Sequence, residues 1–146
     1  MKAIALVACV GKKKPIPSLA RDLYISDWFL KASVYAARVA DMWYILSAKY
    51  GLVAPGTVIE PYDETLNRMG VKARRAWARR VLADLKRVLQ PGDRVVILAG
   101  GRYREGLMGP LRRMGCTVEV PMEGLRIGEQ LRWLKQRLGG GDDRRV

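Results

Sequence analysis

The sequence predicts a single-domain α/β protein: a Rossmann-like, three-layer α/β/α fold built on a mainly parallel four-stranded sheet. Two observations lead to this prediction. Four short apolar segments alternate with four helical segments along the 146 residues, and such alternation places helices on both faces of a parallel sheet. The apolar segments are nearly continuous rather than alternating, as in strands buried on both faces. We expect the domain to span 1–138 and the Gly-rich, charged segment 139–146 to be a flexible tail.

The strands are identified by short apolar runs bounded by turn residues. They are expected over 2–8, 42–47, 94–99 and 117–120. Long loops are expected over 9–25 and 48–66, after the first and second strands, because both segments contain prolines and lack a clear period. We find no internal repeat.

The helices are identified by caps and by periodicity. They are expected over 26–40, 71–89, 103–114 and 127–138. Ser26 belongs to the residue types that cap helix N-termini. The apolar face expected for the helix that follows fits helical spacing only loosely, and it comprises Phe29, Leu30, Val34, Ala37 and Val39. The second helix is the clearest, because Trp77 belongs to a set of apolar residues that recur every three or four positions.

The chain is strongly basic. Lys and Arg number 27 against 14 Asp and Glu, which gives a net charge of +13 at neutral pH. Coulomb attraction then favours partners such as DNA, RNA or a phosphorylated small molecule. A general effect of composition on solubility is the alternative. The sequence does not determine the oligomeric state.

The absence of histidine excludes several kinds of chemistry. Ser-His-Asp and Cys-His mechanisms and histidine zinc sites are ruled out, and no metal or cofactor is expected. The two cysteines are too few for a disulfide framework, which favours reduced thiols and a cytoplasmic location. No apolar stretch approaches the ~20 residues of a membrane helix, so no membrane partner is expected.

The predicted topology gathers four loops at one edge of the sheet. Right-handed crossovers place the segment that follows each parallel strand at the same edge. These segments begin at Cys9, Ala48, Gly100 and Pro121. Open α/β sheets bind ligands at the carboxyl ends of their strands, so we expect a ligand site there.

The first of these loops contains CVGKKK. Gly11, Lys12 and Lys13 fit an anion site made of backbone N–H groups and lysines, although the spacing is not that of a P-loop. A solvated lysine run is the alternative. Cys9 could be a nucleophile if nearby lysines lowered its pKa, or it could be a small hydrophobic residue that forms the floor of the site.

The second loop begins with LSAKYGL. Ser47 ends the strand, Lys49 offers a cation, and Gly51 permits a tight turn or a close ligand approach. With no histidine present, Glu60 and Asp63 are the best candidates for a general base. The alternative for Asp63 is that it caps a short helical turn.

Two further segments carry positive charge. Gly100 and Gly101 open a helix after a strand, and with Arg102 and Tyr103 they fit an anion site, or else a plain strand-to-helix turn. Along the second predicted helix, four cations could follow a phosphate backbone: Lys72, Arg75, Arg79 and Lys86. A solvated helix face is the alternative.

Several segments together resemble a family of small uncharacterised prokaryotic and phage proteins and, more distantly, the peroxide-stress protein YaaA. They are CxGKK from Cys9, ARDLYxSxxF from Ala20, LSAKYGL from Leu46, PYDxTL from Pro61, GGxYREGL from Gly100 and PMEGLRIGEQLRWL from Pro121. That family usually has Ser or Cys at position 9 and often has His where this chain has Tyr50. The resemblance implies no settled activity. YaaA-like proteins are associated with DNA binding, which agrees with the charge.

These observations predict a nucleic-acid- or nucleotide-binding protein, with phosphates near Lys12, Lys13, Lys49 and Gly101. One alternative is an enzyme that acts on a nucleotide, a nucleoside or a modified base. It would use carboxylate chemistry, with four candidate residues: Cys9, Ser47, Glu60 and Asp63. The other alternative is a module whose basic surface binds an acidic protein.

Overall fold

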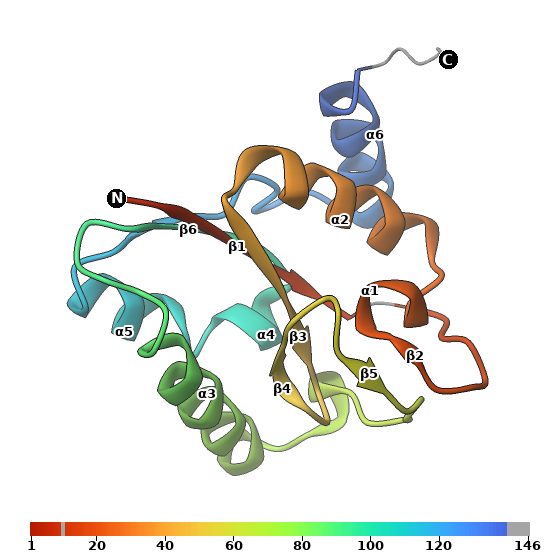
Figure 1. The fold of residues 1–146 in the computed structure, drawn as a ribbon, viewed down its shortest axis with the longest axis horizontal. Coiled ribbons are helices and arrows are strands. Elements are labelled where there is room, and N and C mark those ends of the chain that lie inside the picture. Colours follow the sequence, from red (N-terminus) through yellow and green to blue (C-terminus); the bar gives the residue numbers. More distant parts are fainter. Residues whose placement is uncertain (10, 140–146) are drawn as a thin grey trace.

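Five strands form the central sheet of the computed structural model, which describes residues 1–9 and 11–139 (Figure 1). Their order across the sheet is β4-β3-β1-β6-β7. They span Ala3–Ala8 (β1), Met42–Ser47 (β3), Gly51–Val53 (β4), Arg94–Leu98 (β6) and Thr117–Glu119 (β7). Strands β1, β3, β6 and β7 run parallel, as predicted, whereas β4 runs antiparallel to β3.

The prediction of a four-stranded sheet is wrong because it missed β4. Gly51 has a φ of +76°, which lets the chain turn back tightly after β3. The returning strand then pairs with β3, with Gly51 opposite Ser47. Three residues are too few to show a strand period, so the sequence pattern does not reveal this edge strand.

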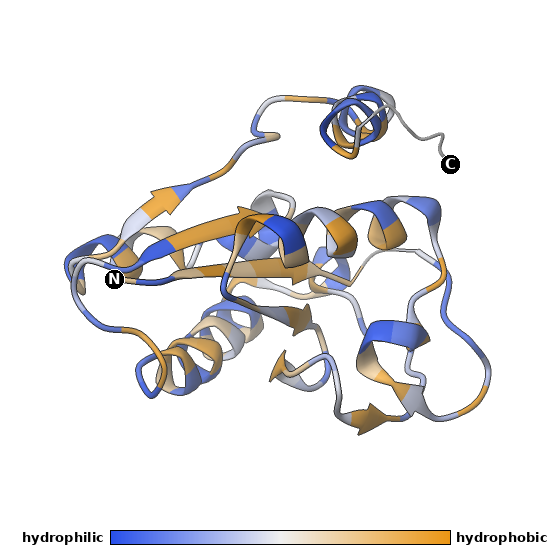
Figure 2. Cartoon of the chain, turned by 45° about the horizontal axis from the view of Figure 1, so that its top comes forward, coloured by the Kyte–Doolittle hydropathy of each residue, from blue (hydrophilic) through white to orange (hydrophobic). Residues whose placement is uncertain are grey.

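Helices cover both faces of the sheet (Figure 1). Helices α2 (Asp27–Val39) and α6 (Ile127–Arg137) pack together on one face, and α3 (Val71–Leu85), α4 (Gly101–Arg104) and α5 (Met108–Arg113) lie on the other. Residues 4–8 of the central strand are fully buried, which explains their continuous apolar run. Figure 2 shows hydrophobic residues along the central strands and hydrophilic ones on the outer helix surfaces.

The two segments predicted as long loops, 9–25 and 48–66, contain short elements instead. These are β2 (Ser18–Leu19), α1 (Ala20–Leu23), β5 (Val58–Ile59) and the 3₁₀ helix η1 (Leu66–Arg68). Strands β2 and β5 pair antiparallel, with Ser18 opposite Ile59. This small ribbon ties the two segments together, and each of its strands is too short to be predicted from periodicity.

The cap of α2 is confirmed, and its predicted apolar face is partly wrong. The Ser26 side chain accepts a hydrogen bond from the backbone N–H of Phe29 at 3.2 Å. Leu30 and Val34 are 49% and 44% exposed, whereas Ala32 is fully buried. Phe29 is also fully buried, so the side of the helix that packs on the sheet carries Phe29 and alanines rather than Leu30 and Val34.

The helix predicted over 103–114 is wrong, because two short helices, α4 and α5, occupy this segment. Gly106 lies between them, and a Cβ built on it would lie 2.8 Å from the Cβ of Ala78 on α3. The close contact with α3 therefore requires glycine where the chain changes direction. The helix predicted over 71–89 is confirmed as α3, although it ends at Leu85.

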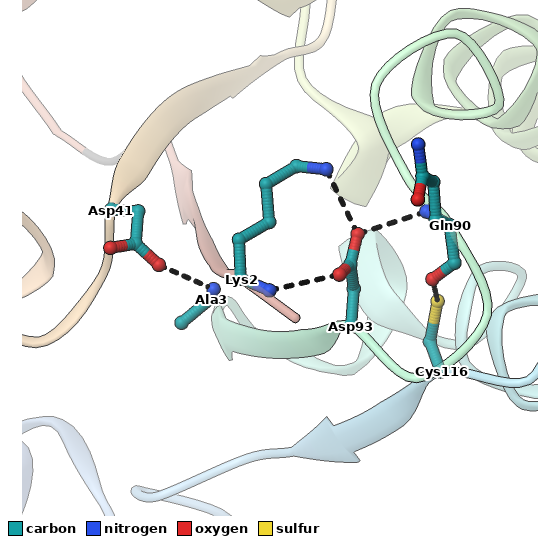
Figure 3. A network of polar contacts seen from close by, with 6 residues as sticks. All are labelled: Lys2, Ala3, Asp41, Gln90, Asp93 and Cys116. Carbon is teal, nitrogen blue, oxygen red and sulfur yellow. Dashed lines mark hydrogen bonds and ion pairs between the residues drawn. The ribbon is translucent and has the colours of Figure 1, made fainter.

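A polar network holds the amino-terminal ends of β1 and β6 together (Figure 3). The buried carboxylate of Asp93 accepts hydrogen bonds from the backbone N–H of Lys2 at 2.9 Å, from its Nζ at 3.0 Å and from the backbone N–H of Gln90 at 2.9 Å. These hydrogen bonds lower the pKa of Asp93 to about 2, and the bond from the Lys2 backbone N–H contributes most. Nearby, Asp41 accepts a hydrogen bond from the backbone N–H of Ala3 at 2.8 Å.

The predicted flexible tail lies almost entirely outside the described residues, whereas the finding on membrane-spanning helices concerns the described part of the chain. Of the tail predicted over 139–146, all but Gly139 lies outside the described residues. Within the described part, no helix is both long and apolar enough to cross a membrane.

Candidate functional site

The carboxyl ends of three parallel strands meet at one edge of the sheet, as predicted from the topology. Cys9 follows β1 and donates its backbone N–H to the carbonyl of Leu46 on β3 at 3.2 Å. Ser47 ends β3, and Gly100 follows β6. The segment after β1 leads to α2 on one face, and the segment after β6 leads to α4 on the other. Such a divergence opens the crevice in which α/β sheets bind ligands.

Five side chains gather at this edge and are called here the edge cluster: Cys9, Tyr24, Ser47, Tyr62 and Tyr103. The hydroxyl oxygens of Tyr24 and Tyr62 lie 2.6 Å apart, and the Ser47 hydroxyl donates to that of Tyr62 at 2.8 Å. The Cys9 Sγ lies 3.7 Å from the hydroxyl oxygen of Tyr103. The cluster therefore joins residues from both predicted loops and from α4.

Backbone and aromatic contacts fix the cluster in place. Ser47 Oγ accepts the backbone N–H of Tyr50 at 3.0 Å, and the Ser47 carbonyl accepts the indole N–H of Trp77 at 2.8 Å. The Trp77 ring meets the Tyr103 ring edge-on, with centroids 5.7 Å apart. The Tyr103 hydroxyl also lies 3.4 Å from the backbone nitrogen of Leu66. Helix α3 thus supports the site from behind.

The phenols of the cluster are neutral at physiological pH. Burial, and next the proximity of Cys9, raise the pKa of Tyr24 and of Tyr62 well above the ordinary range. The same two causes raise the pKa of Tyr103 to about 12. Hydroxyls in this state are hydrogen-bond donors and acceptors rather than bases.

Two lysines lie over the rings beside the cluster. The Nζ of Lys13 is 4.7 Å from the ring centroid of Tyr62 and 5.7 Å from that of Tyr24. The Nζ of Lys49 is 5.3 Å from the Tyr50 ring, which itself meets the Tyr62 ring at 5.6 Å. Within the described residues, neither lysine has a carboxylate partner. The structure therefore brings these two predicted cations to one place.

The loop that carries Lys13 is held by backbone contacts. Gly11 has a φ of +81°, and a Cβ on it would lie 2.7 Å from the Cβ of Ser26. The N–H of Lys14 donates to the carbonyl of Leu23 at 2.8 Å, and Lys12 accepts from Ile25 at 2.9 Å. Glycine is therefore required at position 11 for this path. The Lys12 side chain is exposed.

The glycine-rich turn after β6 contributes one residue to the cluster. Tyr103 is buried and reaches Cys9, whereas Arg102 is exposed and lines a pocket between α3 and α4. Gly100 and Gly101 are exposed, with open space where a Cβ would lie. The turn thus leaves room for a ligand beside the cluster but does not bring Arg102 into it.

The two candidate carboxylates lie on either side of Tyr62 in the sequence, and both are exposed. Thr65, and not Asp63, caps η1, because its Oγ1 accepts the backbone N–H of Asn67 at 3.3 Å. The expectation that Asp63 is a cap is therefore wrong. Among the described residues, neither Glu60 nor Asp63 makes a side-chain hydrogen bond to the edge cluster, and no group of His, Cys, Asp and Glu there could hold a metal ion.

The four cations predicted for nucleic-acid binding are all exposed, three of them on α3 and Lys86 directly after it. Arg75 lines the pocket with Arg102. Arg79 and Lys86 line a more open groove against α5, about 600 Å³ in volume. Lys72 lies near the start of the helix. These four cations therefore do not form one continuous surface, although all lie on the face of the sheet opposite α2 and α6.

Sequence reasoning missed Tyr24 as a member of the site and did not see that Tyr62 is its centre. Tyr62 stands in Pro61-Tyr62-Asp63, and Tyr24 stands shortly before the Ser26 cap. Both belong to blocks that carry the family resemblance, and this was the signal that could have identified them. A single sequence does not distinguish such tyrosines from ordinary core residues.

Comparisons with known proteins identify relatives without an assigned activity. No solved structure matches the chain significantly. The chain is 29% identical over 121 residues to the uncharacterized protein YfjM of Bacillus subtilis (strain 168), a match that covers 73% of this chain and 75% of that protein. The more distant likeness to YaaA stays a prediction. The model of a family of unknown function, DUF6884, matches residues 4–136, and the chain therefore belongs to this family.

Proposed function

We propose that the protein binds the phosphates of a nucleotide or a nucleic acid at the carboxyl edge of its sheet. The observation that carries this proposal is the placement of Lys13 and Lys49 over linked tyrosine rings, with no carboxylate partner in the described residues. Cations that are held in position but not neutralised are available to an anionic ligand.

The surroundings of the two lysines support an anionic ligand. The neighbouring phenols are neutral, so they can donate hydrogen bonds to phosphate oxygens without repelling them. Contact with aromatic rings orders the lysine side chains before a ligand arrives. The net charge of +13 attracts polyanions from a distance.

An enzyme acting on a nucleotide, a nucleoside or a modified base is less well supported. Cys9 is 8% exposed and lies among hydroxyls rather than beside a base. Both candidate carboxylates, Glu60 and Asp63, are exposed rather than enclosed with it. Acid–base catalysis usually requires a titrating group within reach of the reacting atoms. An acidic protein partner would instead use the cations of α3.

The proposal is tested with the double variant Lys13→Ala/Lys49→Ala. We expect binding of a labelled oligothymidylate or of ATP, measured by fluorescence anisotropy and calorimetry, to weaken about tenfold. The slope of log K against log salt for the oligonucleotide should fall by about 1.5, because two fewer cations release counterions.

The matched control is Arg132→Ala/Lys135→Ala, which removes the same charge from exposed positions of α6, outside the edge cluster and its two lysines. The control should bind within about twofold of the natural chain at moderate salt. Equal losses in both double variants would mean that net charge alone attracts the ligand, and would overturn the proposed site.

A further inference from the structure

A second pocket lies between α3 and α4, behind the edge cluster. Its volume is about 360 Å³. Three arginines line it: Arg74 and Arg75 from α3, and Arg102 from α4. From the sequence, Arg75 was expected in a nucleic-acid-binding helix face and Arg102 in the loop at the sheet edge. The packing of α4 on α3 instead places both in one pocket.

The charges of this pocket are not balanced. Arg74 is the only one of the three with an ion pair in the described part of the chain: its Nε lies 3.0 Å from a carboxylate oxygen of Glu105. Its Nη1 also donates to the carbonyl of Met69 at 2.6 Å. Arg75 and Arg102 have no ion pair or side-chain hydrogen bond with any described residue. One carboxylate thus faces three guanidinium groups.

The walls of the pocket are fixed by packing. Trp77 lines it and is 4% exposed, and its indole N–H is anchored to the Ser47 carbonyl at 2.8 Å. Gly106 contacts Ala78 so closely that a side chain at position 106 would push α4 away from α3. Arg74 is 11% exposed and is held at two points. The walls of the pocket are therefore formed before any ligand binds, whereas the side chains of Arg75 and Arg102 are exposed.

We infer that this pocket is a second phosphoryl-binding site, which takes a phosphate group through Arg75 and Arg102, with Arg74 behind them. Guanidinium groups bind phosphate oxygens in pairs of parallel hydrogen bonds, and three converging arginines suit a dianion better than a single carboxylate. Trp77 lines this pocket and Tyr103 belongs to the edge cluster, so their ring pair, with centroids 5.7 Å apart, lies between the pocket and the rest of the cluster. The inference does not depend on the function proposed for that edge.

The phosphoryl group could belong to a free phosphorylated molecule or to a nucleic-acid strand. The probes are therefore inorganic phosphate, pyrophosphate and an oligothymidylate, each titrated into the full chain labelled with ¹⁵N. We expect the side-chain Nε–H signals of Arg74, Arg75 and Arg102 to shift. Tighter binding of pyrophosphate than of the oligonucleotide identifies a free phosphorylated ligand, and the reverse identifies a strand.

Two variants make the test specific. Arg75→Ala/Arg102→Ala removes exposed side chains without partners among the described residues, so the fold is retained, and phosphoryl binding, followed by the remaining Nε–H signal of Arg74, should weaken at least about tenfold. Glu105→Gln removes the only carboxylate among the described residues that line the pocket and leaves Arg74 bonded to Met69, so binding should tighten by about threefold at low salt.

The outcomes separate this inference from the proposed function. Lys13→Ala/Lys49→Ala should leave the titration of the arginine signals unchanged, because the two sites lie on opposite sides of the Trp77–Tyr103 pair. The inference is overturned if none of the probes shifts the arginine signals, if Glu105→Gln fails to tighten binding, or if the α6 control Arg132→Ala/Lys135→Ala weakens binding as much as Arg75→Ala/Arg102→Ala does.

Discussion

The two edges of the sheet differ in whether their charged side chains are paired within the chain. At the amino-terminal edge, the buried Asp93 carboxylate is satisfied by three donors from Lys2 and Gln90 (Figure 3). At the carboxyl edge, neutral hydroxyls bond to one another, while Lys13 and Lys49 lie beside them with no carboxylate partner in the described part of the chain.

This difference distinguishes charged groups that stabilise the fold from charged groups that can bind a ligand. A charge whose hydrogen bonds are all made within the chain stabilises the fold and has little left to offer a ligand. A cation that packs on a ring without an anion contributes little to stability but attracts anions. We therefore expect substitutions at the two edges to have different consequences, and the predictions below test that contrast from the largest expected effect to the smallest.

The largest effect is expected for Asp93→Ala at the amino-terminal edge. The substitution removes the carboxylate of a residue that is 3% exposed and leaves the backbone N–H groups of Lys2 and Gln90 without that acceptor. We expect the melting temperature to fall by at least about 5 °C. Calorimetry at neutral pH measures this shift, and anisotropy should show unchanged ligand binding at a temperature where the variant is folded. A variant that loses binding while keeping its melting temperature would contradict the contrast.

The pH dependence of stability should also differ between the edges. The pKa of Asp93 is lowered to about 2, so its carboxylate stabilises the fold at neutral pH, and this stabilisation is lost as pH falls from about 4 to about 2. The pKa of Tyr103 is raised to about 12, so its contribution is complete below about pH 10 and is lost as pH rises through about 12.

Urea unfolding across the pH range distinguishes the two titrations. Asp93→Asn should flatten the acid side of the stability profile and leave the alkaline side as it is. Tyr103→Phe should make the alkaline side shallower, with Tyr24 and Tyr62 still contributing to it, and leave the acid side as it is. If either variant changed both sides equally, the titrating groups would lie elsewhere in the chain.

The sequence predicted the parallel core of the fold because buried strands leave a strong signal. The apolar run that includes residues 4–8 identified the central strand, and the topology rules then placed Cys9, Ser47 and Gly100 at one edge. The missed elements are those that leave no distinct pattern in the sequence. Strand β4 depends on a turn at Gly51, and the break in the helix predicted over 103–114 depends on the approach of Ala78.

The sequence predicted the sheet edge at which the candidate site lies, but only some of the residues that gather there. Charge singled out Lys13 and Lys49, because both stand in segments that follow strands of the predicted sheet. The tyrosines were not distinguished, because Tyr24 and Tyr62 come together only when the two long loops cross at the β2–β5 ribbon. Arg102 was assigned to the wrong side of Tyr103, because successive residues of a short helix point in different directions.

A smaller effect is expected for Tyr62→Phe at the carboxyl edge. The ring is retained, but the hydroxyls of Tyr24 and Ser47 lose their common partner. We expect the free energy of unfolding to fall by about 1–2 kcal/mol, measured by urea denaturation. Ligand binding should weaken as well, because the rings beneath Lys13 and beside Lys49 are ordered by this contact. A loss of stability without any loss of binding would mean that the edge cluster is only part of the core.

The smallest effect on stability is expected for Lys13→Ala/Lys49→Ala. Each substitution removes one or two contacts between a lysine and an aromatic ring, and each such contact contributes about 0.5 kcal/mol at a partly exposed site. Removing two positive charges from a chain with a net charge of +13 relieves repulsion and offsets that loss. We expect the free energy of unfolding to stay within about 0.5 kcal/mol in urea denaturation, while binding of the oligonucleotide falls about tenfold. A loss of about 2 kcal/mol or more would show that these lysines stabilise the fold as Asp93 does. The two edges would then differ only in the kind of bond they use, and the case for a ligand at the carboxyl edge would rest on net charge alone.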